Sequence, residues 1–445
     1  MKRVFSSIFI LILFNAVSSG AQTKGQNVFT LEQSIQIALE KNYDVRVNKQ
    51  RIQTSDAQVR AAFGSYLPSA DVSLGYQRQF GLKSRNYQGL VYDVPADQLS
   101  NYSLQATAQY LIFDGFNRDA LYSQAEKTLD ANRMTAEQTR DNIRIEVIRN
   151  YINVIKNGQI VKIRRQNIEE GRKTLEMIQA QFKAGTISIT PVYAQEAALG
   201  TRELELLQAE NDVNIAKANL LVTMGLEADM EATFLETSLA NDVGDEDMLG
   251  FRKRIGGEQS LIKRAIDSRQ DIRALEASLE ASRAYVRSTM SGYYPKLYAQ
   301  GGWMFSNNQF NNFGERGFSY LGLSLQVPVF EQFRTNAQKQ TAELQLVQNE
   351  MEIRRLENVV RSNIQLAILN LDGAEKGLEI SRRALRSAEM NFRSVEESFK
   401  VGTANSTDLT TANAQLITAQ VNRVTSVYNY LQIQKEVLYA IGELK

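Results

Sequence analysis

The side chains that most often carry out catalysis or bind metal ions are missing from this chain. The sequence has no histidine and no cysteine, so it lacks the commonest general base, the commonest nitrogen ligand of zinc and any thiolate. It also has no G-x-S-x-G motif, the turn on which many hydrolases place a nucleophilic serine. We therefore predict that the protein is not an enzyme and that it uses no metal ion and no cofactor.

Charge and the start of the chain narrow the class of protein further. The 51 lysine and arginine residues nearly balance the 50 aspartate and glutamate residues, so nucleic-acid binding has no electrostatic basis. Residues 1–21 have the form of a signal peptide, with Lys2 and Arg3 before the apolar stretch "VFSSIFILILF" and small residues up to Ala21. That stretch is too short to span a membrane, so we expect export and cleavage.

One short pattern occurs twice, in "AQFKAGTISITPVYAQ" (179–194) and "ESFKVGTANSTDLTTA" (397–412). Gly185 and Gly402 lie 217 residues apart, and the same offset relates Phe113 to Phe330. Nearer the start of the chain the offset is 227, so the first copy has a longer loop. Self-similarity of this kind indicates a tandem duplication. We predict a first repeat over 22–225, a charged connection over 226–257 and a second repeat over 258–445.

Each repeat is expected to contain a helix, two strands, a long helix, a turn and a last helix. Alternation of apolar and polar residues predicts strands at 69–80, 102–112, 296–306 and 319–328. Residues 116–184 and 333–401 contain no proline and predict helices roughly 100 Å long. Shorter helices near 30–64, 190–225, 258–292 and 407–442 would pack in pairs, end to end, along the long ones.

The alternating strands fit two environments. One is a soluble two-sided sheet, and the other is a transmembrane barrel, which four strands cannot close without further chains. In a barrel the lipid would meet Val72, Leu74, Tyr76, Leu104, Trp303, Leu323 and Leu325. The lumen would receive Asp71, Ser73, Gln77, Gln105, Gln109 and Gln326. Six aromatic residues suit the lipid face or its interfacial girdles, or else plain packing on the sheet: Tyr76, Tyr110, Phe113, Trp303, Phe305 and Phe330.

Several short motifs keep the same order in both repeats. They are "YLP" and "YYP" before the first strand, "LIFDGFNR" and "VPVFEQFR" before the long helix, and "FKAGT" and "FKVGT" at the turn. With "LEQSIQIALEKNYDVR" as the opening helix, this order resembles the outer-membrane efflux protein family of TolC-like channels over 28–445. The resemblance implies an α+β membrane protein. Its duplicated helical hairpins would form a periplasmic α-barrel, and three chains would share a twelve-stranded β-barrel, with 226–257 near the equator of the tube.

The resemblance also implies a function and partners. A homotrimer in the outer-membrane lipid would be the exit duct of a tripartite efflux or type I secretion system and would conduct its cargo passively. Its partners would be a periplasmic adaptor (membrane fusion) protein and an inner-membrane transporter of the RND, ABC or MFS type. The alternative is a helical structural or adhesion protein of the periplasm or the cell surface. The cargo and the transporter class stay open.

By this layout the two repeated turns are the periplasmic tips, where the resemblance implies adaptor docking. The residues concerned are Gly185, Thr186, Thr190, Pro191, Gly402, Thr403 and Thr407. The two glycines suit positions after a helix end that need positive φ, while Thr190 and Thr407 are predicted N-caps. Pro191 would then be the first residue of its helix. Simple helix-hairpin turns would explain these residue types equally well.

The resemblance places Asp408 at a constriction of the lumen, and Thr411 one turn later where relatives carry a second acid. Three Asp408 carboxylates in a ring would favour cations. Alternatively, Asp408 is a first-turn acid that the helix dipole stabilises. Relatives hold the tip closed through polar links at the positions of Thr190, Pro191, Phe399 and Ala404. Since neither proline nor alanine can act as the acid or base of such a link, the closure needs another explanation.

Overall fold

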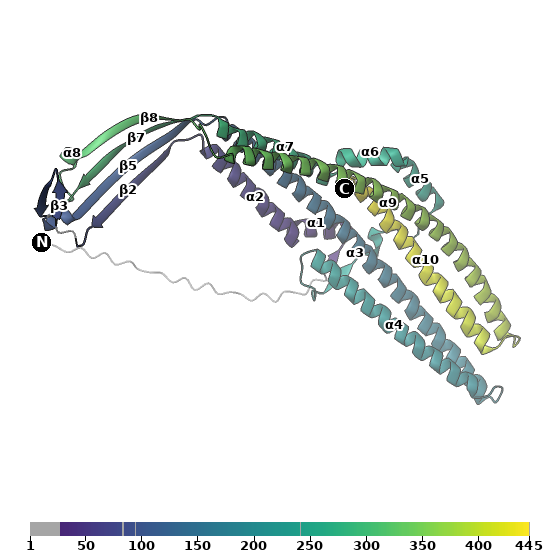
Figure 1. Ribbon diagram of the computed structural model, residues 1–445. Helices are drawn as coiled ribbons and strands as arrows, with labels where there is room; N and C mark the ends of the chain where they lie inside the picture. Colours follow the sequence, from purple (N-terminus) through teal and green to yellow (C-terminus); the bar gives the residue numbers. More distant parts are fainter. Residues whose placement is uncertain (1–26, 82–83, 94, 241, 445) are drawn as a thin grey trace, which may run out of the picture.

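The computed structural model describes residues 27–81, 84–93, 95–240 and 242–444, so the predicted signal peptide at 1–21 lies outside the described residues. Figure 1 shows an elongated molecule with a curved sheet at one end. Helices run from the sheet to two hairpin turns at the other end. The combination of long helical hairpins with one larger sheet confirms the predicted α+β class.

The larger sheet is antiparallel and has the strand order β2-β5-β7-β8. Its strands are β2 (Ser69–Arg78), β5 (Ser100–Phe113), β7 (Lys296–Asn307) and β8 (Gly317–Gln326), all within two residues of the predicted bounds. The strands come from both halves of the chain and meet where β5 pairs with β7. Strands β2 and β8 are therefore the two edges of the sheet, and neither has an outer partner within the described chain.

Two long helices run the length of the helical part. Helices α3 (Asn117–Lys183) and α9 (Arg334–Lys400) each have 67 residues, which corresponds to about 100 Å. Helix α3 packs against α4 (Thr190–Thr223), α2 (Tyr43–Gly64) and α1 (Leu31–Lys41). Helix α9 packs against α10 (Ser406–Ala440), α7 (Gln270–Met290) and α6 (Glu258–Ser268). Shorter helices thus lie along each long helix, as predicted, and α3 also packs against α7 and α10.

The predicted helices at 30–64 and 258–292 are each broken into two, because one residue leaves the helix to dock on a neighbour. Asn42 separates α1 from α2, and its Nδ2 donates to Thr223 O at 2.9 Å. Arg269 separates α6 from α7, and its Nη1 donates to Ala440 O at 3.1 Å. Both acceptors lie at the last turn of a return helix, so each break joins a short helix to the end of a hairpin.

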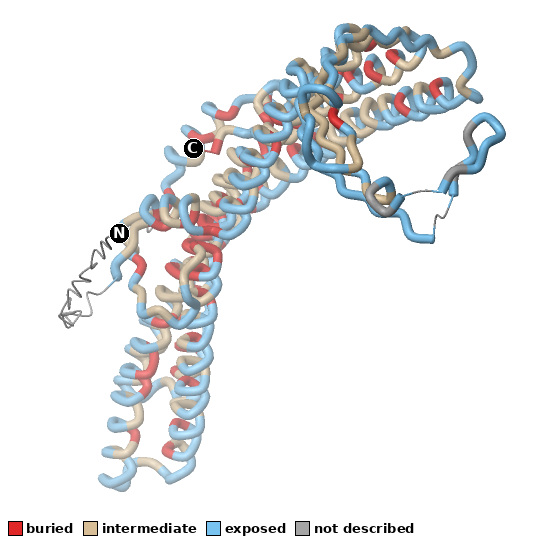
Figure 2. The backbone as a smooth tube through the Cα atoms, turned by 90° about the vertical axis from the view of Figure 1, so that its left-hand side faces the viewer, coloured by how far each residue is buried: buried red, intermediate tan, exposed pale blue. Residues whose placement is uncertain are grey.

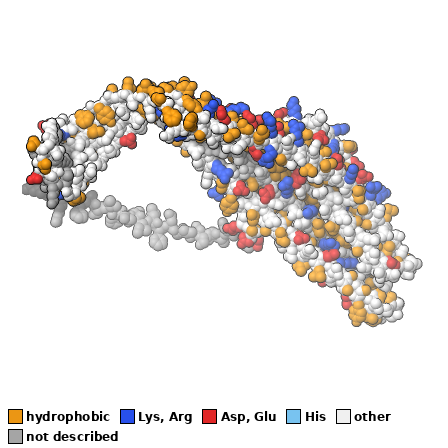
Figure 3. Space-filling view, viewed as in Figure 1, with side chains coloured by type: hydrophobic (Ala, Val, Ile, Leu, Met, Phe, Trp, Pro, Cys, Tyr) orange, Lys and Arg blue, Asp and Glu red, His pale blue; other side chains and the backbone are white. Residues whose placement is uncertain are grey.

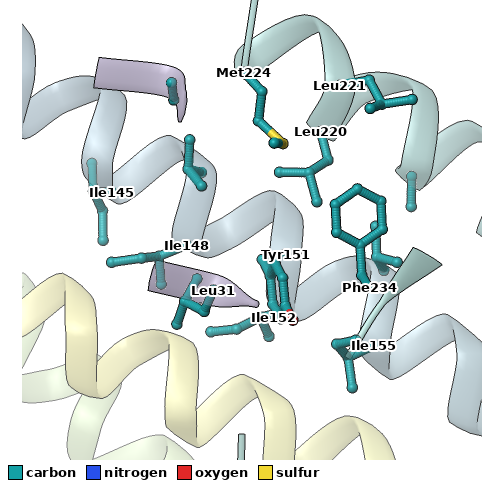
Figure 4. Close-up of a cluster of buried hydrophobic side chains, with 14 of the residues drawn as sticks. Leu31, Ile145, Ile148, Tyr151, Ile152, Ile155, Leu220, Leu221, Met224 and Phe234 are labelled. Carbon is teal, nitrogen blue, oxygen red and sulfur yellow. The ribbon is translucent and has the colours of Figure 1, made fainter. Parts of the chain in front are cut away.

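The described residues of 226–257, which we predicted to connect two repeats, are folded onto the helices. They contain β6 (Ala232–Phe234), which pairs in parallel with β1 (Asn27–Phe29), and helix α5 (Asp245–Ile255). The rings of Phe234 and Tyr151 of α3 pack edge-on, with their centroids 5.7 Å apart. Both residues belong to a buried hydrophobic cluster that also contains Leu220 and Met224 (Figure 4). A second cluster surrounds Phe251 of α5. These two clusters hold the middle of the molecule together.

The remaining elements are short. A hairpin of β3 (Ser84–Tyr87) and β4 (Leu90–Asp93) lies in the chain between β2 and β5, and α8 (Phe313–Arg316) lies between β7 and β8. Figure 2 shows that buried residues follow the facing sides of the helices, whereas the strands are mostly exposed or half-buried. Of the helices in the described parts, none combines the length and the apolar character needed to cross a lipid bilayer.

Candidate functional site

The two tip turns have the same backbone geometry. Gly185 and Gly402 take positive φ values of 73° and 81°, which glycine adopts without steric cost. Each glycine N–H donates to a carbonyl three residues earlier, Phe182 O at 2.9 Å and Phe399 O at 3.1 Å. The expected role of both glycines as residues that follow a helix end is confirmed.

The threonine after each glycine completes the turn. The N–H of Thr186 donates to Gln181 O at 3.1 Å, and that of Thr403 donates to Ser398 O at 2.9 Å. The two hydroxyl groups donate to the same carbonyls, at 2.8 and 3.0 Å. At each turn the backbone bond of the glycine and that of the threonine together form a Schellman motif, so the repeated Gly-Thr pattern is explained by helix termination.

The return helices begin within one residue of the predicted bounds, but both predicted caps are wrong. Helix α4 follows Ile189, whose backbone is already helical, so Thr190 is its first residue and Pro191 its second. An N-cap needs an extended backbone, which Thr190 does not have. Helix α10 begins at Ser406 and is capped by Asn405, whose backbone is extended. Thr407 therefore lies inside the helix.

Asp408 takes part in the cap of α10. The Oδ1 atom of Asn405 accepts from the N–H groups of Thr407 and Asp408 at 2.9 and 3.0 Å. In return the Oδ2 atom of Asp408 accepts from the Asn405 N–H at 3.2 Å, which closes a capping box. Both Asp408 and Thr411 are exposed. The first-turn role of Asp408 thus has a geometric basis, and its place in a pore constriction stays a prediction.

This cap gives a first testable prediction. Asn405→Ala removes the side chain that satisfies two N–H groups and should destabilise the start of α10 by about 1 kcal/mol. Thr407→Ala removes no cap and should cost less than about 0.5 kcal/mol. Hydrogen exchange of the first-turn amides of α10 measures both effects. Equal protection in the two variants would contradict the assignment of the cap.

The strand pairing collects apolar side chains on one face of the sheet. Val72 pairs with Ala106, which pairs with Trp303, and directly paired residues point to the same side. Leu321 and Val72 are 89% and 77% exposed on this face. In Figure 3 hydrophobic side chains gather along the outer side of the sheet. Such a large exposed apolar surface indicates contact with lipid or with another apolar partner.

The opposite face of the sheet is largely polar. Asp71 pairs with Thr107, Ser73 pairs with Gln105, and Gln109 pairs with Gln300. The predicted alternation therefore continues across neighbouring strands, although these come from both halves of the chain. A β-bulge between Leu111 and Phe113 changes the alternation near the end of β5, so that Phe113 pairs with Leu297. Ile112 falls in that bulge.

The six aromatic residues do not all have the same environment. Tyr76 and Tyr110 are exposed on the apolar face, and Tyr76 packs against Tyr102 at 4.9 Å. Trp303 stacks on Phe305 at 6.3 Å. Phe305 differs from the exposed aromatic residues because its side chain is fully buried. The centroid of its ring lies 4.4 Å from that of Phe313 in α8. Phe305 therefore lies on the apolar side of the sheet but beneath other rings.

The corners between strand and long helix repeat as well. Phe113 packs edge-on with Phe116, and Phe330 packs edge-on with Phe333. Phe116 and Phe333 both have positive φ, an uncommon conformation for such residues.

At the first corner, Asp114 is buried and accepts from the Arg118 N–H at 2.9 Å. Nearby, burial and a hydrogen bond to Asp119 raise the pKa of Tyr66 to about 12. These contacts join the start of α3 to the residues that precede β2 and follow β5.

Within the described ranges, no group of three or more acidic residues is arranged to hold a metal ion. The candidate sites predicted from the sequence are surfaces, namely the tips and the two faces of the sheet.

Known proteins resemble this chain over most of its length. The model of a family described as outer membrane efflux protein matches residues 34–226 and 261–443. The outer membrane efflux protein BepC of Brucella suis is 21% identical, with 99% of this chain and 92% of that protein covered. The outer membrane protein TolC of Escherichia coli is 19% identical, with 98% and 86% covered. The solved structure of the outer membrane protein VceC of Vibrio cholerae has a TM-score of 0.76 at 16% identity, with 93% and 96% covered.

Proposed function

This chain belongs to the outer membrane efflux protein family, and on that premise we propose that it is the trimeric exit duct of a tripartite efflux or type I secretion system. It is an outer-membrane protein that extends into the periplasm. The duct would pass cargo to the outside without an energy source of its own. An inner-membrane transporter of the RND, ABC or MFS type and a periplasmic adaptor would supply the cargo.

The observation that carries this proposal is the open, one-sided sheet. An unpaired strand edge is not viable in lipid, and both β2 and β8 are edges in the described chain. Pairing β8 of one copy with β2 of the next removes both edges when the ring closes. Three copies of a four-stranded sheet give twelve strands, an even number as in bacterial barrels. The apolar face would then meet lipid and the polar face would line the lumen.

The helices support the same assembly. Several large apolar side chains lie exposed on the outer helices of the chain, among them Leu204 and Leu207 of α4 and Leu366 and Leu369 of α9. Exposed apolar side chains along a long helix favour side-by-side contact with another helix. Three chains in a ring would cover these residues and extend the tube by about 100 Å.

Two measurements on the purified full-length protein test the duct. A trimeric mass in detergent and single-channel conductance in a planar bilayer are the expected results. A monomer that stays soluble without detergent and does not conduct would favour the alternative, a helical structural or adhesion protein. For the partners, photo-crosslinking in cells from position 408 should capture an adaptor or transporter, whereas the same probe at Leu323 on the sheet should not.

A second prediction concerns the tip carboxylate. If three Asp408 side chains face the lumen, Asp408→Asn should weaken the block of conductance by polyvalent cations, because the ring loses its negative charge. Asn405→Ala is the matched control, since it disturbs the same capping box but keeps the carboxylate. Titration of the block in planar bilayers separates the two variants. An unchanged block in Asp408→Asn would place this residue outside the lumen.

A further inference from the structure

A cavity lies where the sheet meets the helices. Its volume is about 450 Å³, which is in the range of sites for small ligands. The start of α3, the end of α7, the start of α9 and the adjoining ends of β7 and β8 surround it. We call this cavity the corner pocket, and the lining residues that matter below are Leu121, Tyr285, Tyr294, Lys296, Glu331 and Arg334.

The corner pocket belongs to the polar side of the sheet. Lys296 pairs directly with Gln326, and both residues line the pocket. Because side chains alternate along a strand, Lys296 lies on the same face as Gln300, which is part of the polar face described above. The pocket is therefore separate from the apolar face that we expect to meet lipid.

The carboxylate of the corner pocket is already occupied by donors of the chain itself. Nη2 of Arg334 donates to Oε1 of Glu331 at 3.0 Å, and the buried hydroxyl of Thr335 donates to Oε2. The bond from Thr335, the contact with Arg334 and the nearby charge of Lys296 lower the pKa of Glu331. Glu331 is thus ionised, and its charge is balanced by Arg334.

The charges of the corner pocket therefore do not cancel. Among the described residues that line it, three carry a charge, namely Lys296, Glu331 and Arg334. Glu331 forms an ion pair with Arg334, whereas Lys296 forms none within the described parts of the chain. Lys296 is also half-buried. A partly desolvated ammonium group attracts an anion more strongly than one in open water, so the pocket favours a ligand with one negative charge.

Apolar surface adjoins this ammonium group. The side chains of Leu121, Tyr285 and Tyr294 line the same cavity, and all three are exposed to it or to solvent. Sites for small ligands typically combine apolar walls with a few polar groups that fix the orientation of the ligand. A ligand with an acidic group at one end and an aromatic or aliphatic body would satisfy both parts of the pocket.

We propose that the corner pocket binds small amphipathic organic acids. The ammonium group of Lys296 would pair with the carboxylate, while Leu121, Tyr285 and Tyr294 would contact the apolar body. In the proposed duct the polar face lines the lumen, so such acids would be a class of cargo that binds here on its way out. This last step rests on the proposed duct function, but the binding itself does not.

The experiment measures binding to the purified full-length protein in lipid nanodiscs by isothermal titration calorimetry. The probe is naphthoate, and naphthamide has the same rings without the charge. Empty nanodiscs give the background from partition into lipid. Lys296→Gln removes the proposed partner of the carboxylate. Lys339→Gln is the matched control, because it removes the same charge further along α9, where Lys339 pairs with Glu343 at 3.4 Å.

Lys296→Gln should weaken the binding of naphthoate about tenfold, because a charged hydrogen bond is lost, and Lys339→Gln should leave it unchanged. Lys296→Arg should keep most of the affinity. Glu331→Gln should strengthen binding, because it removes the anion nearest to the site. The proposal would be overturned if Lys296→Gln and Lys339→Gln bound naphthoate equally, if naphthamide bound as tightly as naphthoate, or if the native protein bound neither probe.

Conductance tests the link to cargo separately. Naphthoate should reduce the single-channel current of the native protein in a planar bilayer, and Lys296→Gln should relieve that reduction. A protein that binds naphthoate and conducts, but whose current the probe leaves unchanged, would refute the link to cargo. A protein that binds naphthoate and does not conduct would refute the duct and would support the corner pocket as a site.

Discussion

Arginine in place of Leu323 is expected to keep the protein out of the outer membrane, whereas arginine in place of the adjacent Ser324 is not. Leu323 pairs with Ala299 on the exposed apolar face of the sheet, and Ser324 pairs with Tyr298 on the other face. A lipid-facing arginine costs about 2–4 kcal/mol at the middle of the bilayer. In the proposed trimer the substitution occurs three times, so the penalty reaches roughly 6–12 kcal/mol.

Fractionation of cell envelopes and counting of detergent-stable trimers measure this difference directly. The two substitutions introduce the same side chain at neighbouring positions of one strand, so strand propensity and net charge are matched. Only the face of the sheet differs. If the Leu323→Arg protein inserted as well as Ser324→Arg, the apolar face would not be a lipid contact. That result would favour a soluble sheet covered by a protein partner.

Gly225→Ala is expected to be the most destabilising of the glycine substitutions at helix ends. Gly225 has a φ of 72°, and an added Cβ atom would lie 2.6 Å from Lys41 O and 2.9 Å from Asn42 N. Backbone atoms cannot rotate away as a side chain can, so α1 and α2 would have to move. We expect about 1 kcal/mol for the positive φ and about 2 kcal/mol for the overpacking.

Gly185→Ala separates these two costs. Gly185 has a φ of 73°, but nothing lies within 4 Å of the added Cβ atom, so only the backbone term of about 1 kcal/mol should remain. Urea unfolding followed by circular dichroism compares the two variants. Equal midpoints would show that the chain around Lys41 adjusts freely. Equal midpoints would also argue against a rigid contact between the helix break at Asn42 and the end of α4.

Much of the fold could be predicted because it follows from local patterns. Alternation over about ten residues places β2, β5, β7 and β8, and the absence of proline over long stretches allows α3 and α9. The glycines at 185 and 402 were expected to take positive φ because each follows a helical stretch. The lengths of the helices then required the shorter ones to pack along the longer ones.

Other features could not be predicted from the sequence, because they depend on the local backbone conformation or on residues that are distant in the chain. Thr190, Thr407 and Asn405 are all acceptable caps by type, and the backbone conformation selects only Asn405. The break at Asn42 looks like helix in the sequence, since the cause is a carbonyl at the end of α4, 181 residues away. The burial of Phe305 depends likewise on where α8 places Phe313.

The sequence by itself determined where this chain turns, which stretches are helix or strand, and which side of each strand is apolar. These properties depend on a residue and its near neighbours in the sequence. Both copies of a repeated motif therefore form the same local structure. Only the tertiary structure decided that Asn413 meets Asn167, that the backbone at Lys41 closes over Gly225, and that one Gly-Thr turn is followed by a capping box and the other is not. The first two contacts join residues that are distant in the chain, so they arise from the packing of whole helices. The third depends on the backbone angles at Ile189 and Asn405, which residue type alone does not set.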